Sequence, residues 1–326
     1  MTALVTGATG FLGSQLVRTL LKSESEVRIF RRATSGLDML GAAKDEVHHS
    51  VGDITDMDAL CEAMKDVQVV FHAAGNVRFG SKSLHRVNVQ GTAAVVNAAL
   101  KCGVERLVHT SSVSAIGKRE HTVADESTEW QPGSQMVPYA RSKYLAELEV
   151  QRGIAEGLDA VMVNPSLIFG PDYSRGKAPN ITHDYARIIG TGKLWFYPGG
   201  GTSVVDIDDV VTGHLLALER GRTGARYILA SENLSWNSLF SILAKVQGAK
   251  PPRIQLPYQL AVAGGTLTDI WSRTTGHKLP IGLSVVKYIY KNHRYSNKRA
   301  IDELGCSFRP FMETAQRVAD SLVADQ

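Results

Sequence analysis

ALVTGATGFLG, residues 3–13, is the stretch that decides the fold. In it a short apolar run breaks into three glycines, Gly7, Gly10 and Gly13, and a helical pattern of leucines follows. Gly7 permits a tight turn, Gly10 lets backbone N–H groups approach a pyrophosphate, and Gly13 lets the helix lie close to the strand. Unpaired N–H groups and the helix dipole favour an anion at a helix N-terminus, so this pattern predicts a dinucleotide-binding cradle. A glycine-rich turn without a ligand is the alternative.

A second motif, YARSK at residues 139–143, opens another helical stretch. A spacing of four places the phenol of Tyr139 and the ammonium of Lys143 on one helix face, one turn apart. Because a nearby cation favours the phenolate, we expect Tyr139 to exchange a proton well below its ordinary pKa of roughly 10. A surface Tyr–Lys pair is the alternative.

The run LVHTSS, residues 107–112, favours the chemical interpretation of that pair. It is an apolar strand that ends in hydroxyls, and an open α/β sheet presents its ligand-facing residues at such strand ends. A serine there can bind a substrate oxygen while Tyr139 supplies a proton and a nicotinamide supplies a hydride.

Strand-like and helical segments alternate through the first half of the chain, which predicts a doubly wound parallel sheet wrapped by helices. The expected strands cover residues 27–30, 47–51, 67–72, 106–110 and 160–165. The expected helices cover residues 58–65 and 89–99. Later candidates are strands at 204–207 and 225–230 that return to the sheet, and a helix at 236–246 capped by Ser235.

Composition is that of an ordinary soluble enzyme. The 326 residues are 44% hydrophobic and 21% charged, and a net charge of +4 gives no reason to expect nucleic acid as a partner. Three distant cysteines predict reduced thiols in the cytoplasm, and ten histidines without ligand spacing predict no metal.

No membrane span or signal peptide is expected. The first residues already read as a strand, and no apolar run approaches the roughly 18 residues that cross a bilayer. The nearest candidate, residues 256–267, is interrupted by two glycines. It predicts a helix of a C-terminal lobe, with surface attachment to a membrane as the alternative.

The order of motifs along the chain resembles the extended short-chain dehydrogenase/reductases, and within them the dihydroflavonol 4-reductase-like branch. Besides the motifs above, the matching stretches are GDITD at 52–56, FHAA at 71–74, VNVQGT at 87–92, NP at 164–165, GP at 170–171 and DIDDV at 206–210. The resemblance implies two parts. The first is an NADP-binding Rossmann domain made of residues 1–170 and returning segments near 204–230. The second is a smaller mixed substrate lobe made of residues 171–203 and 231–326.

The resemblance also implies roles for single residues. Tyr139 is expected to be the general acid for reduction, and Ser112 the catalytic hydroxyl beside it, with Ser111 as the alternative. Lys143 is expected to bind the nicotinamide ribose in addition to lowering the pKa of Tyr139. Asn88 matches an asparagine of the family, with structural support as reasonable a role as chemistry. Further cofactor contacts are expected at Gly7, Thr9, Gly10, Phe11, Leu12, Gly13, Asp53, Ile54, Ala73, Ala74, Gly75 and Pro165.

The alternative for Asp53 is a turn or helix-capping residue. Related enzymes often dimerise through the helices after Asn88 and after Tyr139, so a homodimer is an expectation from the resemblance alone.

The end of the second expected strand distinguishes NADP(H) from NAD(H). An acidic residue there binds a ribose 2′-OH, whereas arginine suits a 2′-phosphate. Here the strand runs into Arg31 and Arg32 with no carboxylate at its tip, and a guanidinium binds phosphate through paired hydrogen bonds. We therefore predict NADP(H), with two solvated loop arginines as the alternative.

The substrate is inferred from what is missing and from aromatic residues. Similar sugar-nucleotide enzymes carry an arginine before the strand that matches residues 204–207, and an arginine and an aromatic residue in the strand that precedes Asn164. This chain has neither arginine and lacks that aromatic residue. Candidates to line an apolar pocket, each with ordinary lobe core as its alternative, are Phe79, Tyr173, Trp195, Phe196, Tyr197 and Tyr258. Arg78 and Arg175 are candidates to bind an acidic group of the substrate, with solvated loop arginines as the alternative.

These features predict an NADPH-dependent reductase of a fairly apolar ketone or aldehyde, which oxidises a secondary alcohol in reverse. One alternative is a nucleotide-sugar epimerase or dehydratase with retained NAD(P). Others are a 3β-hydroxysteroid-type dehydrogenase and a cofactor-sensing protein on the same fold.

Overall fold

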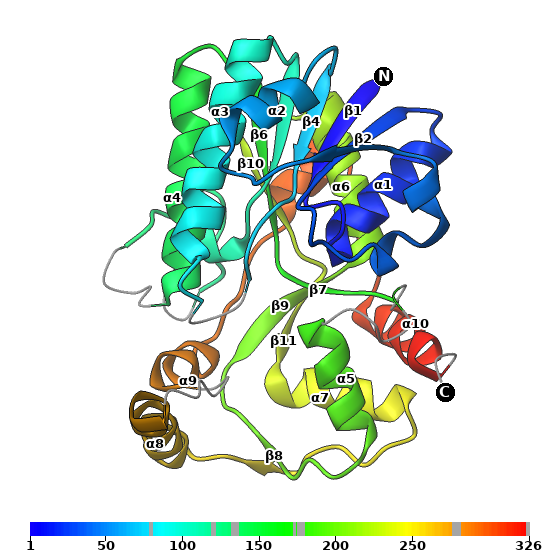
Figure 1. Cartoon of the computed structure of the whole chain (residues 1–326). Coiled ribbons are helices and arrows are strands. Elements are labelled where there is room, and N and C mark those ends of the chain that lie inside the picture. The colour runs from blue at the N-terminus through cyan, green and yellow to red at the C-terminus, as the bar shows by residue number, and fades with distance from the viewer. Residues whose placement is uncertain are drawn as a thin grey trace.

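A seven-stranded parallel sheet forms the larger part of the molecule (Figure 1). The computed structural model describes residues 1–77, 81–118, 122–131, 137–171, 174, 180–275 and 282–323. In spatial order the strands are β3 (His48–Val51), β2 (Glu26–Arg31), β1 (Thr2–Thr6), β4 (Val69–His72), β5 (Arg106–Thr110), β6 (Ala160–Pro165) and β10 (Arg226–Leu229). The strand order reverses at β1, which confirms the predicted doubly wound Rossmann sheet.

Helices cover both faces of this sheet. α1 (Phe11–Lys22) and α6 (Ile207–Arg220) pack together on one face. The other face is covered by α2 (Met57–Ala63), α3 (Gly91–Cys102) and α4 (Pro138–Ala155) (Figure 1). Strands buried on both faces read as continuous apolar runs, and accordingly every residue of β6 is buried. Shorter helical segments are η1 (Asp38–Asp45), η2 (His85–Gln90), η3 (Val113–Ala115) and η4 (Ala300–Leu304).

The parallel register brings the carboxyl ends of the strands to one level. Thr6 of β1 pairs with Phe30 of β2 and with His72 of β4, and His72 pairs with His109 of β5. The loops that follow these strands therefore begin side by side along one edge of the sheet. In open α/β sheets this edge is where ligands bind.

A smaller lobe lies next to that edge (Figure 1). Its sheet contains β7 (Leu167–Phe169), β9 (Gly201–Asp206) and β11 (Glu232–Ser235). Three helices pack around this sheet and share its buried core: α5 (Ile181–Gly190), α7 (Trp236–Val246) and α10 (Phe311–Val323). Ser235 caps α7 as predicted, because its hydroxyl accepts a hydrogen bond from the Ser238 N–H at 3.0 Å.

Two segments lie elsewhere than predicted. Residues 204–207 do not return to the large sheet, because β10 occupies the place beside β6 and β9 instead pairs with β7 and β11. Residues 225–230 do return, as β10. Within the predicted lobe segment 231–326, Ala300 and Leu304 of η4 belong to the same buried cluster as Val5 of β1. Part of that segment therefore completes the large domain.

The end of the lobe farthest from the large sheet is formed by β8 (Phe196–Tyr197), β12 (Ile254–Gln255) and α8 (Tyr258–Thr275) (Figure 1). α9 (Leu283–Ile289) packs against α8. The helix predicted at residues 256–267 is α8. Within the described ranges, no helix combines the length and the apolar character that crossing a bilayer would require. All three cysteines are free thiols.

Candidate active site

The three glycines of the opening motif hold β1, α1 and the loop after β4 in close contact. Gly7 has a φ of +72°, and a Cβ on it would lie 2.5 Å from the Ala74 nitrogen. The Gly10 N–H donates to the Gly7 carbonyl at 3.0 Å, and a Cβ on Gly13 would overlap that carbonyl. Any side chain at Gly7 or Gly13 would force these elements apart.

α1 begins at Phe11, and its N-cap is Gly10, which has no side chain with which to cap the helix. Its first N–H groups are thus left for an anion, which fits the pyrophosphate of a dinucleotide. Thr9 and Leu12 lie half-buried at this turn, and the Phe11 ring meets the His183 ring edge-on at 5.2 Å between centroids.

The end of β2 presents Arg31 and Arg32. Arg31 is half-buried and donates from Nε to His49 Nδ1 at 2.9 Å and from Nη1 to the Arg32 carbonyl at 3.2 Å. Arg32 is exposed. This edge therefore offers guanidinium groups to whatever binds beyond β2, and their contact to a 2′-phosphate stays a prediction.

Asp53 organises the turn that leads to α2. One carboxylate oxygen accepts from the N–H and hydroxyl of Thr55 at 3.0 and 2.7 Å, and the other pairs with Arg86 Nη2 at 2.9 Å. The hydrogen bonds from Thr55, and secondarily Arg86, lower the pKa of this carboxyl. The cap of α2 is Asp56, so Asp53 plays the turn role that the sequence left open, and its adenine contact stays a prediction. Ile54 packs against Gly91, where a Cβ would lie 2.9 Å from its Cγ2.

Tyr139, Ser112 and Lys143 come together where β5 ends and α4 begins. Ser112 follows β5, and its side chain caps η3 by accepting from the Ser114 N–H at 3.1 Å. The Tyr139 hydroxyl makes a side-chain hydrogen bond with Ser112. Lys143, one turn further along α4, is buried and donates from Nζ to the Thr110 carbonyl at 2.9 Å.

The electrostatics of this cluster differ from the sequence-based expectation. Burial raises the pKa of Tyr139 to about 12, although the hydrogen bond with Ser112 opposes that shift. The expected lowering by Lys143 is therefore wrong for this structure. Its physical reason is that desolvation of the phenolate dominates, while the Lys143 ammonium is bound to a backbone carbonyl. Burial also lowers the pKa of Lys143 to about 8.

His214, as a neutral imidazole, holds Thr110, the residue whose carbonyl binds Lys143. The hydroxyl of Thr110 lies 2.8 Å from Nε2 of His214 on α6, and Nδ1 of the same ring lies 2.7 Å from the Val210 carbonyl. Burial lowers the pKa of His214 to about 4, so the imidazole is uncharged near neutral pH. Thr110 is thus anchored to α6 by its side chain and to Lys143 by its carbonyl.

Asn88 joins the loop after β4 to α4. Its amide oxygen accepts from the Asn76 N–H at 2.7 Å, and its NH₂ donates to the Asn76 carbonyl at 3.0 Å and to the Ser142 hydroxyl at 2.9 Å. This loop contains Ala73, Ala74 and Gly75, and a Cβ on Gly75 would lie 3.3 Å from Lys143 Nζ. The contacts of Asn88 are those of a positioning residue, the structural alternative left open by the sequence.

Behind Ser112, a buried polar network connects β6, α4 and β10. Asn164 donates from Nδ2 to the Ser112 carbonyl at 3.0 Å and to Glu147 Oε1 at 2.6 Å. Glu147 Oε2 lies 3.4 Å from Arg226 Nη1. Ser111 is buried beside this network, and Pro165 is buried at the end of β6.

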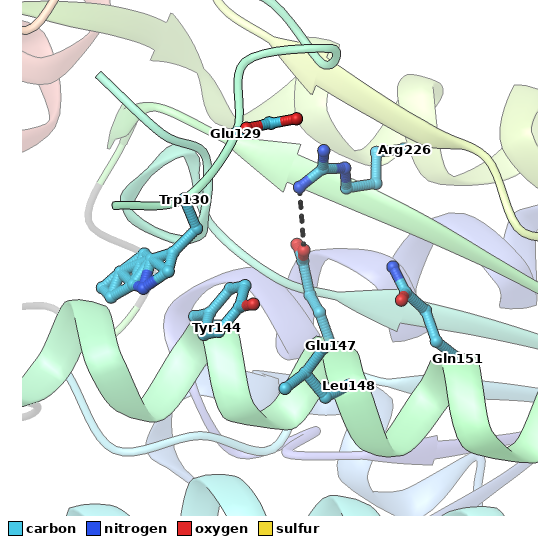
Figure 2. Close-up of a pocket in the computed structure, with 7 residues that line it drawn as sticks. All are labelled: Glu129, Trp130, Tyr144, Glu147, Leu148, Gln151 and Arg226. Carbon is cyan, nitrogen blue, oxygen red and sulfur yellow. Dashed lines mark hydrogen bonds and ion pairs between the residues drawn. The ribbon is translucent and has the colours of Figure 1, made fainter. Parts of the chain in front are cut away.

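A pocket of about 330 Å³ opens on the side of α4 where Glu147 and Arg226 meet. Figure 2 shows the Trp130 and Tyr144 rings side by side at its wall, stacked with centroids 4.5 Å apart and an interplanar angle of 13°. Its lining is Glu129, Trp130, Tyr144, Glu147, Leu148, Gln151 and Arg226. None of these described residues is a predicted catalytic or cofactor residue. Glu147 lines this pocket and is also hydrogen-bonded to Asn164, which binds the Ser112 carbonyl. The pocket therefore lies behind Ser112 and not at the glycine turn of residues 7–13.

The predicted substrate residues are only partly placed. Arg78, Phe79, Tyr173 and Arg175 lie outside the described residues. Trp195 is 69% exposed next to β8, and Tyr197 is half-buried on β8. Both stay predictions.

Sequence reasoning missed Tyr288 on α9. Its hydroxyl lies 3.1 Å from the Ser114 hydroxyl, and its proximity contributes to the raised pKa of Tyr139. The His293 ring stacks on Tyr288 with centroids 4.2 Å apart, and Lys118 Nζ lies 4.2 Å from its ring centroid. No local motif marks this tyrosine, because it lies 174 residues after Ser114 in the sequence and only the folded chain brings the two together.

Known proteins resemble the chain over nearly its full length. A protein of Synechocystis sp. provisionally named dihydroflavonol 4-reductase is 34% identical over 98% of this chain and 92% of its own. Sterol demethylase protein B of Methylococcus capsulatus is 33% identical over 82% of this chain and 81% of its own. The crystal structure of gox2253 superposes with a TM-score of 0.87 and 33% identity, covering 99% of this chain and 98% of that one.

The family model described as "NAD dependent epimerase/dehydratase family" matches residues 3–230. Together with the arrangement of the glycine cradle and the Tyr139–Ser112–Lys143 cluster, these similarities identify the type of protein. The chain belongs to the NAD-dependent epimerase/dehydratase family, as an oxidoreductase of the extended short-chain dehydrogenase/reductase type.

Proposed function

We propose that the protein is an NADPH-dependent reductase of a fairly apolar ketone or aldehyde. The observation that carries this proposal is the hydrogen-bonded pair of Tyr139 and Ser112, with Lys143 one turn away, at the edge that also holds the glycine cradle. Two hydroxyls converging on one point can both donate to a carbonyl oxygen. One of the two, that of Tyr139, is also the proton donor that reduction of a carbonyl asks of the protein.

Each of the three residues has a distinct role. Ser112 binds and orients the carbonyl oxygen. Tyr139, whose pKa of about 12 keeps it protonated near neutral pH, gives its proton to the developing alkoxide. Lys143 places positive charge one turn from the phenolate that forms. Before proton transfer, burial outweighs this charge and keeps Tyr139 protonated, and the ammonium is held in place by Thr110.

The residues at the carboxyl ends of the sheet strands fit a bound NADPH, which would supply the hydride. The uncapped start of α1 would hold the pyrophosphate. Ala73, Ala74 and Gly75 would line its middle, Pro165 would border the nicotinamide, and Arg31 with Arg32 would bind the 2′-phosphate. Arg31 and Arg32 are the reason for proposing NADPH over NADH.

The substrate class follows from composition and from names of relatives. Arginines typical of sugar-diphosphate sites are missing at both positions where the sequence would carry them. The relatives at 33–34% identity are named for dihydroflavonol reduction and sterol demethylation, which concern ring systems with little charge. We therefore place the substrate among apolar, preferably cyclic, carbonyl compounds.

A panel of ketones and aldehydes, followed by NADPH absorbance, tests the proposal. Turnover of an apolar ketone by the wild type and its loss in Tyr139→Phe are expected. Tyr144→Phe is the matched control, since this tyrosine lies on the same helix and stacks on Trp130. Tightly retained cofactor with no net NADPH consumption by any carbonyl compound would instead indicate an epimerase or dehydratase.

A further inference from the structure

Exposed apolar side chains gather at the end of the small lobe. Of the 18 large hydrophobic side chains that are exposed in the described part of the chain, eight lie between residues 195 and 271, and these include every exposed aromatic one. Exposed large apolar side chains that concentrate in one part of a soluble domain often mark an interaction surface. We call its core the apolar tip, defined as Trp195, Phe196, Ile254, Leu260, Leu267 and Trp271.

The two faces of α8 differ in character. Leu260, Leu267 and Trp271 follow at intervals of seven and four residues, which places them on one helix face, and they are 56–67% exposed. The opposite face packs on α9, where a Cβ on Gly265 would lie 3.0 Å from Val286 Cγ2. The acidic residue of the helix, Asp269, accepts from the Leu283 N–H at 3.1 Å and so faces α9. The outward stripe is therefore apolar.

The other exposed side chains of the tip, Trp195, Phe196 and Ile254, lie on or beside the strand pair β8–β12. The N–H groups of Arg253 and Ile254 both donate to the Trp195 carbonyl at 3.1 Å, and Ile254 pairs with Phe196. The chain then passes directly into α8, whose first residue, Tyr258, has its ring centroid 5.3 Å from that of Tyr290. The exposed side chains thus project from backbone that is held by hydrogen bonds and packing.

The charged residues around the tip are mostly basic, which favours an anionic partner. Residues 191–199 and 249–275 contain four basic residues and one acidic residue. Lys193, Lys250 and Arg253 are exposed, whereas the acidic Asp269 is bonded to α9. Tryptophan and tyrosine beside lysine and arginine suit the interfacial region of a bilayer with anionic headgroups. A symmetric contact between two copies would instead bring the basic side chains of both together.

We propose that the apolar tip docks on the surface of an anionic phospholipid bilayer, with its apolar side chains in the interfacial region and Lys193, Lys250 and Arg253 at the headgroups. The docking does not depend on the proposed reaction.

Co-sedimentation of the full chain with vesicles tests this proposal. The wild type should sediment with phosphatidylcholine vesicles that contain phosphatidylglycerol and should be released by high salt. Leu267→Glu/Trp271→Glu should lower the apparent partition coefficient by about tenfold or more, and Lys193→Glu/Arg253→Glu should do so at low salt. Ile301→Glu, which adds a charge at a residue 45% exposed on η4, is the matched control and should bind like the wild type.

Two further measurements make the outcome decisive. Vesicles with brominated acyl chains should quench wild-type tryptophan fluorescence, and Trp271→Phe should keep binding while losing part of the quenching. Equal sedimentation of the wild type and Leu267→Glu/Trp271→Glu would overturn the proposal, as would wild type that ignores anionic vesicles. Light scattering that shows a dimer dissociated by Leu267→Glu/Trp271→Glu would also overturn it and assign this surface to a second copy. Loss of carbonyl reduction in every assay would leave the vesicle result unaffected.

Discussion

The cluster of Tyr139, Ser112 and Lys143 and the apolar tip hold their side chains in opposite ways. In and around the cluster, polar groups are buried and bonded to one another: Lys143 to the Thr110 carbonyl, Tyr139 to Ser112, and Asn88 to the loop after β4. At the tip, large apolar side chains such as Leu267 project into solvent from an ordered backbone. The difference teaches that the cluster is organised by contacts within the chain, whereas the tip presents side chains that contacts within the chain leave exposed. Changes at one site should therefore leave the other intact.

The largest effect should come from removing the proton donor. Tyr139→Phe should lower kcat for carbonyl reduction by about 10²–10⁴-fold, because it removes the proposed proton donor to the alkoxide, while NADPH affinity changes little. Steady-state kinetics and a fluorescence titration with NADPH measure the two quantities. Leu267→Glu at the tip should change kcat for a water-soluble ketone by less than about twofold, given its exposure. A large kcat loss in the tip variant would break the separation between the two regions.

Cofactor choice should respond strongly to the end of β2. Arg31→Ala/Arg32→Ala should weaken NADPH binding by about 10–100-fold, since charge-assisted hydrogen bonds to the 2′-phosphate are lost. NADH affinity should stay nearly constant. Isothermal titration with both cofactors checks this, and Lys65→Ala, which removes an exposed charge beside α2, is the control. Parallel weakening of NADPH and NADH would show that the arginines support the fold rather than the phosphate.

The pH dependence of reduction should report Lys143. Its pKa of about 8 is lowered by burial, so the ammonium is charged below that pH and neutral above it. Tyr139, with a pKa of about 12, stays a protonated donor throughout this range. The rate of reduction at saturating NADPH should therefore fall above about pH 8, by up to about tenfold per pH unit.

Lys143→Arg offers the matching control. A guanidinium stays charged at all accessible pH values, so any activity that remains should lose this falling limb. A limb that persists at the same pH in Lys143→Arg would assign the titration to another group.

The smallest effect is expected within the lobe. Ser235→Ala removes the cap of α7 and should lower the free energy of unfolding by about 1 kcal/mol, without changing kcat. Urea denaturation and steady-state kinetics measure the two quantities. A matching loss of kcat would mean that the stability of the lobe and the geometry of the Tyr139–Ser112–Lys143 cluster are coupled.

Much of the large domain could be predicted from local sequence. Its strands are apolar runs because both faces are buried, and the glycine spacing at residues 7, 10 and 13 reflects close contacts that the structure confirms. The spacing from Tyr139 to Lys143 placed both residues on α4 near the end of β5. These features depend on neighbours close in the chain or on a motif with a fixed geometry.

Features that depend on distant partners escaped the sequence. Burial, which is set by the whole fold, determines the pKa of Tyr139, and the partner of Lys143 is a backbone carbonyl that no side-chain pattern reveals. β9 pairs with β7 because β10 has taken the place beside β6, a competition between strands far apart in the chain. Tyr288 reaches Ser114 through the fold of the lobe, again without a local signal.

A crystal structure with NADP⁺ bound tests the central claim most directly, through the position of the Tyr139 hydroxyl relative to C4 of the nicotinamide. The account predicts that this hydroxyl and that of Ser112 face C4 across a space for one carbonyl group, with the 2′-phosphate on Arg31 and Arg32. A nicotinamide whose C4 lies away from both hydroxyls, with Tyr139 directed at solvent or the protein interior, would contradict it.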